Sequence, residues 1–302
     1  MLKSETRARQ GPSPLPLRLN ISRRNFIRLA AAAGVAALAA DTVVFEPNRP
    51  RIVRRGLALR RWPARLEGFT IALLSDFHYD SYFSVHPIRS AVGMANVLGP
   101  ELIVLTGDFV SVPLVGNEAV GAVAAEPCAQ LLQHLQAPLG VWAVMGNHDA
   151  YTDPDRVTAA LRAVRIPVLA NQSVPIERDG ARFWLAGVND ILGQKSDLDA
   201  ALHNLPADEA VVLLAHEPDY ADHVARYPVD LQLSGHSHGG QVRVPFLPPL
   251  YLPDLARKYI LGQYQIRGLT LYVNAGIGTV DVPVRMNCPP EITLLTMHRA
   301  QS

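Results

Sequence analysis

Five short polar motifs each follow an apolar run, and their side chains are of the types that ligate divalent cations. In chain order they are Asp76-Phe77-His78, Gly107-Asp108, Gly146-Asn147-His148-Asp149, an isolated His216 and Gly235-His236-Ser237-His238. Carboxylate, imidazole and amide donors without cysteine suit Mn²⁺, Fe, Zn²⁺ or Mg²⁺. A single Asp or His at a strand end is usually a cap, a turn former or a core residue. The ordered set instead predicts a site for two metal ions, with a single Gly-Asp available to bridge them.

The elements that must position these motifs are short apolar runs alternating with helix-like segments. Strands are predicted at 70–75, 102–106, 141–145, 210–215, 231–234 and 269–274, with a further candidate at 183–187. Helices are predicted at 87–98, 119–136, 154–164 and 218–226. Strands that alternate with helices are typical of layered α/β domains, and ligands bind beyond the carboxyl ends of their strands. We therefore expect one α/β domain that gathers all five motifs on one rim.

Composition excludes several classes of protein. The 302 residues are 49% hydrophobic and 18% charged, which is enough apolar material for a buried core and excludes a wholly disordered chain. No window reaches about 18 uninterrupted apolar residues, which argues against a polytopic membrane protein. Cys128 and Cys288 are the two cysteines, too few for a disulfide-rich scaffold or a thiolate zinc cluster. Whether they pair stays open.

The net charge of +1 is unevenly distributed. Residues 1–39 hold seven basic residues against Glu5 alone, a charge of +6, so the remaining residues carry −5. The basic stretch runs into the alanine-rich apolar run Leu29–Ala40. By its length this run is too short to span a bilayer as a helix, but it is typical of a secretory signal.

The pair Arg23-Arg24, followed by Asn25-Phe26-Ile27, resembles the twin-arginine export signal. A basic amphipathic helix and a chance arginine pair are the alternatives. We predict a twin-arginine signal peptide over 1–39, a connector over 40–67 and the catalytic domain over 68–302. Export by the twin-arginine translocase places the protein in the periplasm or on the outer face of the cytoplasmic membrane. Whether the signal is cleaved or retained as an anchor stays open.

Over residues 70–240 the order of the five motifs resembles the calcineurin-like metallophosphoesterase superfamily. The tail, with Gly276-Ile277-Gly278-Thr279 and Pro283-Val284-Arg285, is similar to the exported branch of bacterial phosphoesterases related to YkuE and YaeI. Asn274-Ala275 stands where that branch often has Ser-Arg. The resemblance implies an α/β fold, a four-layer α/β/β/α metallophosphoesterase sandwich, with the dimetal site at the carboxyl ends of the strands.

The resemblance also implies a role for each motif residue. One ion is held by Asp76, His78, Asp108 and His238, and the second by Asp108, Asn147, His216 and His236. His148 is not a ligand; it protonates the leaving oxygen or stabilises the charged transition state. Asp149 orients His148 through the second ring nitrogen. A metal-activated hydroxide then attacks phosphorus.

These roles imply an exported phosphodiesterase or pyrophosphatase. Some relatives in the branch cleave the diphosphate of UDP-2,3-diacylglucosamine, so the expected substrate is a phospho- or diphospho-linked envelope compound. A nucleotidase or nuclease of the same superfamily is one alternative, although a charge of −5 without a basic stripe disfavours long nucleic acids. A non-catalytic metal-binding envelope protein is the other; loss of a ligand would mark it, and every ligand is present.

Two segments lie beside the motifs: 79–86 is rich in aromatic residues, and 244–264 is rich in proline and aromatic residues. Two interpretations stay open: packing beneath long loops, or an apolar rim suited to a lipid tail or a peripheral membrane contact. Arg243 and Arg285 are the basic residues nearest the motifs and are candidates for a phosphate contact.

Overall fold

The computed structural model describes residues 22–112 and 121–301 and divides into two units, residues 1–39 and 40–302. Helix α1 (Arg23–Ala40) continues through the helical turns Asp41–Phe45 and Glu46–Asn48. This 26-residue stretch contains an 18-residue window with a mean hydropathy of 1.7, so it is long and apolar enough to cross a membrane, by length and composition alone. The apolar run alone has only 12 residues, but the helix that contains it extends beyond the run at both ends. A signal sequence passes the same test.

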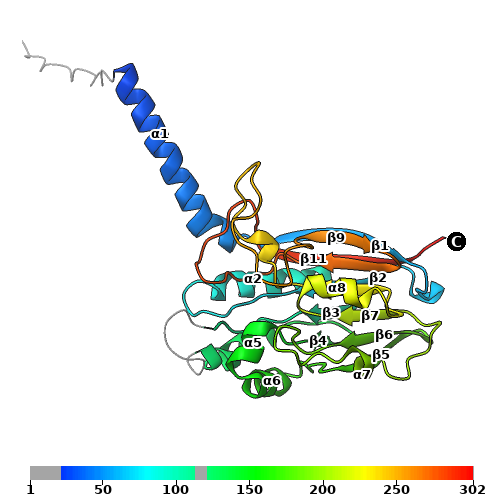
Figure 1. Ribbon diagram of the computed structural model, residues 1–302. Coiled ribbons are helices and arrows are strands. Elements are labelled where there is room, and N and C mark those ends of the chain that lie inside the picture. Colours follow the sequence, from blue (N-terminus) through cyan, green and yellow to red (C-terminus); the bar gives the residue numbers. More distant parts are fainter. Residues whose placement is uncertain (1–21, 113–120, 302) are drawn as a thin grey trace, which may run out of the picture. The chain divides into compact units, whose positions relative to one another are not determined.

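Residues 40–302 form two β-sheets (Figure 1). The first has the order β1 (Arg51–Leu59), β11 (Glu291–Arg299), β2 (Phe69–Leu74), β3 (Leu102–Leu105), β4 (Val141–Ala143). The second has the order β5 (Gln172–Arg178), β6 (Ala181–Gly187), β7 (Val211–Leu214), β8 (Leu231–Ser234), β10 (Leu269–Val273), β9 (Gly262–Ile266). Strands β2, β3 and β4 are parallel, and so are β6, β7, β8 and β10. Within each sheet the motif-bearing strands therefore end at one edge.

Three hydrophobic clusters separate four layers. One cluster joins the first sheet to α2 (Val85–Leu98), α4 (Ala125–Leu132) and α6 (Pro154–Ala163). A second fills the space between the two sheets. The third joins the second sheet to the short helices α7 (Leu198–Ala201) and α8 (Ala221–Val224). The remaining short helical turns are Ala64–Leu66, α5 (Asn147–Thr152), Pro218–Tyr220 and His238–Gly240. The predicted α/β/β/α sandwich is thus confirmed.

All seven candidate strands exist, with ends that differ by at most two residues from those expected. The helix predicted over 119–136 is shorter, since α4 covers Ala125–Leu132; residues 119 and 120 lie outside the described residues. Cys128 and Cys288 are both buried and free.

Residues 40–67 were expected to be a connector before the domain. That expectation was wrong, because they contain strand β1 of the first sheet. β1 pairs in parallel with β11, from Arg51 opposite Glu291 to Leu59 opposite Arg299. Its arginines face solvent while Leu57 and Leu59 are buried, so the basic composition concealed an edge strand.

Candidate metal centre

All seven predicted ligands lie just beyond the carboxyl ends of strands β2, β3, β4, β7 and β8. Sheet one supplies Asp76, His78, Asp108 and Asn147, and sheet two supplies His216, His236 and His238. Each of these side chains is buried, and the most exposed, Asn147, shows 8% of its surface. Two sheets therefore deliver their polar residues to one buried place, as the sequence predicts.

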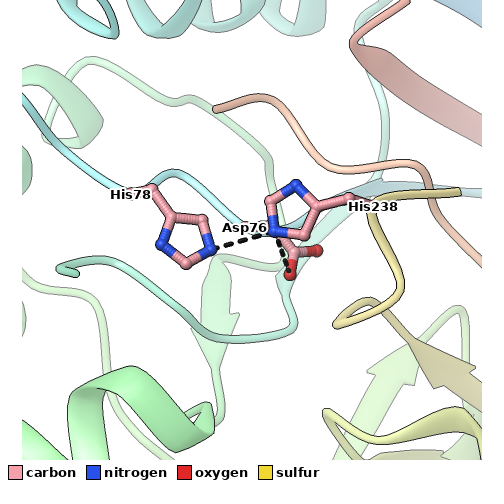
Figure 2. Close-up of side chains that lie close together, drawn as sticks. All are labelled: Asp76, His78 and His238. Carbon is pink, nitrogen blue, oxygen red and sulfur yellow. Dashed lines mark hydrogen bonds and ion pairs between the residues drawn. The ribbon is translucent and has the colours of Figure 1, made fainter. Parts of the chain in front are cut away.

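A first group consists of Asp76, His78 and His238, whose ligand atoms all lie within 4.8 Å of one another. His238 Nε2 is 3.0 Å from His78 Nε2 and 3.5 Å from Asp76 Oδ1. Figure 2 shows the two rings directed toward each other, with the Asp76 carboxylate beside His238. Three donors converge on one point, as the ligands of a single cation do.

A second group consists of Asp108, His216 and His236, again with ligand atoms within 4.8 Å. Asp108 Oδ2 is 3.1 Å from His216 Nε2 and 3.4 Å from His78 Nε2, so it stands between the two groups. This is the position that a bridging carboxylate requires. Asn147 Oδ1 is buried without a hydrogen-bond partner among the described residues.

Contacts on the far side of three histidine rings fix which ring nitrogen faces the site. Each contact engages one nitrogen and leaves the other free to ligate. They are His216 Nδ1 to Thr106 O at 2.5 Å, His78 Nδ1 to Ser111 Oγ at 2.9 Å, and His236 Nε2 to Asp254 O at 2.8 Å. His216 and His78 thus present Nε2, and His236 presents Nδ1.

Four buried atoms at the site lack a hydrogen-bond partner within the part of the chain that the structure describes: Asp76 Oδ2, Asn147 Oδ1, His216 Nε2 and His238 Nδ1. Leaving a buried polar atom unsatisfied costs about 1–3 kcal/mol. Metal coordination would satisfy Asp76, Asn147 and His216 at once. Two carboxylates, four imidazoles and one amide fit two divalent cations bound by nitrogen and oxygen.

Five of the ligand residues have a left-handed backbone, which costs L-residues energy. Their φ angles are Asp76 53°, His78 41°, Asp108 56°, His236 68° and His238 50°. Hydrogen bonds between the loops hold this geometry: Asp76 N–H donates to Gly107 O at 3.0 Å and His78 N–H to Asp108 O at 2.9 Å. The ligand loops are therefore preset by backbone contacts.

Two glycines allow these loops to approach one another. A Cβ at Gly146 would collide with Asp108 Oδ1, and a Cβ at Gly235 would collide with Ser75 Oγ and Asp76 Oδ2. His236 N–H donates to Asp76 Oδ1 at 2.9 Å, so the loop after Gly235 rests on a ligand carboxylate. A side chain at Gly235 would push first-sheet and second-sheet ligands apart, and one at Gly146 would displace Asp108 within the first sheet.

Burial and neighbouring charges together shift the pKa values of the buried ligands. It raises the pKa of Asp76 and lowers the pKa of His236 to about 3, with His216 adding to the second effect. For Asp108 burial acts to raise the pKa, but His216 and His148 hold it well below its usual range. A charged Asp108 and a neutral His236 are the forms that ligate metals.

Comparison with known proteins agrees with this geometry. Residues 69–240 match the sequence profile of the calcineurin-like phosphoesterases, which covers more than half of the chain and includes every predicted ligand. The chain belongs to the calcineurin-like phosphoesterase family. It is therefore a metal-dependent hydrolase of phosphoesters, and its clustered donors fit the two divalent metals of this family.

Three similar proteins align with nearly the full length of this chain. The metallophosphoesterase YkuE of Bacillus subtilis (strain 168) is 32% identical over 286 residues, covering 92% of this chain and 98% of YkuE. The phosphodiesterase YaeI of Escherichia coli (strain K12) is 30% identical over 282 residues, covering 92% of this chain and 99% of YaeI. The UDP-2,3-diacylglucosamine pyrophosphatase LpxG of Chlamydia trachomatis is 25% identical over 335 residues, covering 89% and 98%.

In this phosphoesterase His148 is fixed by backbone contacts on two sides. The Val112 N–H donates to His148 Nδ1 at 2.9 Å, and the His148 N–H donates to Asp108 Oδ1 at 2.9 Å. Burial lowers the pKa of His148 to about 4, so the ring is neutral near pH 7. With Nδ1 accepting, the ring proton is on Nε2. A neutral donor at the cavity suits hydrogen bonding to a phosphate oxygen.

Asp149 does not orient the His148 ring, and that part of the prediction is wrong. Its carboxylate accepts four backbone N–H bonds, from Asp108 at 2.8 Å, Phe109 at 2.8 Å, Val110 at 3.1 Å and Gly146 at 3.0 Å. Burial raises the pKa of Asp149 to about 7. The fully buried carboxylate instead holds the loop that carries Asp108, the residue that would bridge two metal ions.

Arg285 was a candidate for a phosphate contact, but its side chain is wholly buried, so that prediction is wrong. The guanidinium donates to the carbonyls of Ala275 at 3.0 Å, Cys288 at 2.9 Å and Gly278 at 3.1 Å. The Gly278 N–H in turn donates to Asp76 O at 2.7 Å. Arg285 therefore supports the ligand loop through the tail. The tail motif pointed to this residue, but not to its role.

A cavity of about 500 Å³ opens beside the metal groups. Asp108, Asn147, His148, His236 and His238 form one part of its wall. Residues that the sequence motifs did not identify form the rest, among them Tyr151, Leu192, Gln241, Tyr251, Asp281 and Val282. Most of the side chains in this second set are apolar, so the cavity combines candidate ligands with apolar lining residues.

Proposed function

We propose that this phosphoesterase is exported and hydrolyses a phosphodiester or diphosphate bond in an envelope compound with a lipid part. The carrying observation is the cavity, which is lined both by His148 and four of the candidate ligands and by apolar residues that include Leu192, Leu250 and Val282. A phosphate group fits the polar lining and an apolar chain fits the apolar lining. The names of two relatives, a phosphodiesterase and a UDP-2,3-diacylglucosamine pyrophosphatase, support this substrate class.

Two cations, when bound, would neutralise phosphate oxygens and make a water molecule more acidic. The chain's own residues do the rest. His148 Nε2–H donates to an oxygen of the phosphate or of the departing group, and Val112 keeps that proton on Nε2. Asp149 keeps the Asp108 loop in place by its backbone contacts.

A comparison of substrates tests this function. The full chain is purified in detergent and assayed with Mn²⁺, Zn²⁺, Fe²⁺ or Mg²⁺ on bis-p-nitrophenyl phosphate, p-nitrophenyl phosphate and UDP-2,3-diacylglucosamine. We expect the lipid-linked diphosphate to give the highest kcat/KM and the diester to exceed the monoester. Preference for the monoester would favour a nucleotidase, and no hydrolysis with any metal would favour a non-catalytic protein.

We also propose that Arg23 and Arg24 direct export by the twin-arginine translocase, to the periplasm or the outer face of the cytoplasmic membrane. The pair begins helix α1, which is long and apolar enough for a signal or an anchor. Replacing both arginines by lysine keeps the charge and should leave the folded protein in the cytoplasm. Arg54→Lys with Arg55→Lys, on exposed parts of β1, is the matched control. Unchanged export of the first variant, measured by cell fractionation, would contradict this route.

A further inference from the structure

Several apolar side chains on one loop beside the metal cavity are exposed to solvent. Segment 244–251, here called the rim loop, reads Val-Pro-Phe-Leu-Pro-Pro-Leu-Tyr. Phe246 is fully exposed, Leu250 is 68% exposed and Tyr251 is 66% exposed. Single exposed apolar residues are ordinary, but several on one loop mark a contact surface.

The rim loop is stiff and anchored at its base. Pro245, Pro248 and Pro249 fix φ at three of its eight positions. Just before it, the Arg243 N–H donates to Met286 O at 2.8 Å, and Asn287 Nδ2 donates to Arg243 O at 2.9 Å. A loop held in this way keeps its apolar side chains outward at little further cost in conformational entropy.

The apolar surface continues beyond the rim loop. Leu250, Tyr251 and Val282 line the metal cavity, and Val282 is itself 50% exposed. Val282 and Phe83 both line a neighbouring hollow of about 560 Å³, and Phe83 and Val43 both line a small gap beside it. Exposed apolar side chains thus run from the rim loop, past the cavity mouth, to Val43.

Within unit 40–302, the residues that follow α1 in the sequence lie beside this surface. Directly after α1, the Arg285 N–H donates to Thr42 O at 3.0 Å, and the Asn287 N–H donates to Glu46 Oε2 at 3.0 Å. Val43, Val44 and Phe45, between these contacts, are all exposed. Segment 285–287 therefore anchors both the residues that follow α1 and the base of the rim loop.

We propose that the rim loop, with Val282 and Phe83, inserts into the surface of a lipid bilayer and places the cavity mouth at the headgroups. Segment 241–252 contains Arg243 and no acidic residue, which suits a membrane surface with anionic headgroups. Apolar and aromatic side chains on a stiff loop are suited to the boundary between headgroups and acyl chains. This inference rests on the proposed function, because a lipid-linked substrate would then reach His148 without leaving the membrane.

Site-specific fluorescence on the full chain tests the placement. The polarity-sensitive dye NBD is attached to Phe246→Cys; the native cysteines are buried, so labelling is selective. Asp208→Cys, exposed before β7 at the opposite end of the strands from the site, is the matched control. Vesicles of phosphatidylethanolamine and phosphatidylglycerol should shift the emission to the blue at 246 and leave it unchanged at 208. An aqueous spectrum at 246 in membrane-bound protein, or equal shifts at both positions, would overturn the proposal.

Kinetics separates this proposal from the proposed function. Phe246→Asp with Leu247→Asp removes two rim-loop side chains that do not line the cavity. Val97→Asp, at an exposed apolar position near the end of α2, is the control. We expect the double variant to lose at least about tenfold in rate on vesicle-borne UDP-2,3-diacylglucosamine while hydrolysing bis-p-nitrophenyl phosphate like wild type. If the double variant matched wild type on both substrates, membrane insertion alone would be overturned. If wild type hydrolysed neither substrate, the proposed function would be overturned. A smaller assembly mass for the double variant in detergent would instead assign the rim loop to a second copy of the chain.

Discussion

We propose that the reaction depends on His148, which is not one of the predicted ligands. The backbone of Val112 holds its Nδ1 at 2.9 Å, so a neutral ring carries its proton on Nε2. This arrangement replaces the expected partnership with Asp149, whose carboxylate is occupied by four backbone N–H groups. We therefore propose that the ring is a hydrogen-bond donor positioned by a backbone N–H rather than by a carboxylate.

We predict that His148→Ala keeps both metals but lowers kcat on the soluble diester by about 10²- to 10⁴-fold, the usual range for loss of a positioned proton donor. Metal content by plasma mass spectrometry and the rate of p-nitrophenol release measure the two effects. His134→Ala, at an exposed histidine, is the control. Loss of the metals together with the rate would make His148 a ligand, and full activity would remove it from the mechanism.

The ligand loops between strands and helices work as one element because their backbones touch. Gly235 lets the His236 loop of the second sheet rest on Asp76 of the first, where the His236 N–H donates to Oδ1 at 2.9 Å. The affinity for metal is therefore expected to depend on Gly235, although Gly235 is not a ligand.

We predict that Gly235→Ala weakens metal binding and lowers the free energy of unfolding by about 1–3 kcal/mol, the usual cost of overpacking. Its Cβ would displace Ser75 and Asp76. Gly93→Ala, where a Cβ in α2 meets no atom within 4 Å, should be neutral or slightly stabilising. Calorimetric metal titration and urea denaturation measure both effects, and wild-type values for Gly235→Ala would show that the loops tolerate separation.

The sequence predicts the metal site better than the contacts behind it. Motifs such as Asp76-x-His78 follow recognisable strands, so parallel pairing brings them together. Asp149 and Arg285 were misassigned because their partners are backbone groups far along the chain, to which side-chain spacing is blind. Strand β1 was missed because an edge strand with exposed arginines lacks the continuous apolar run of a central strand.

At the scale of the whole molecule, residues 40–67 are part of the folded unit 40–302 and are not a connector outside it. Trp62 and Leu66 are wholly buried, and the Trp62 ring lies 4.8 Å from the Phe183 ring of the second sheet. Arg61 forms an ion pair with Asp230 at 2.8 Å. This segment therefore fastens the first sheet's edge to the second sheet.

We predict that a chain beginning at residue 40 folds and that one beginning at residue 68 does not. The shorter chain loses the buried side chains of Leu57, Leu59, Trp62 and Leu66, each worth about 1.5–3 kcal/mol or more. Their sum is comparable to the whole stability of a typical domain, about 5–15 kcal/mol. Thermal unfolding and solubility distinguish the two chains. Equal melting temperatures would show that β1 is dispensable.

The most direct test of a two-metal phosphoesterase is hydrolysis of bis-p-nitrophenyl phosphate before chelation, after chelation and after metal is restored. We predict that the wild-type full chain loses activity on removal of divalent ions and regains it with Mn²⁺ at about two ions per chain. Asp108→Asn, altered at the carboxylate between the two ligand groups, should not recover. Hydrolysis that survives complete chelation, or recovery of Asp108→Asn to the wild-type rate, would contradict the account.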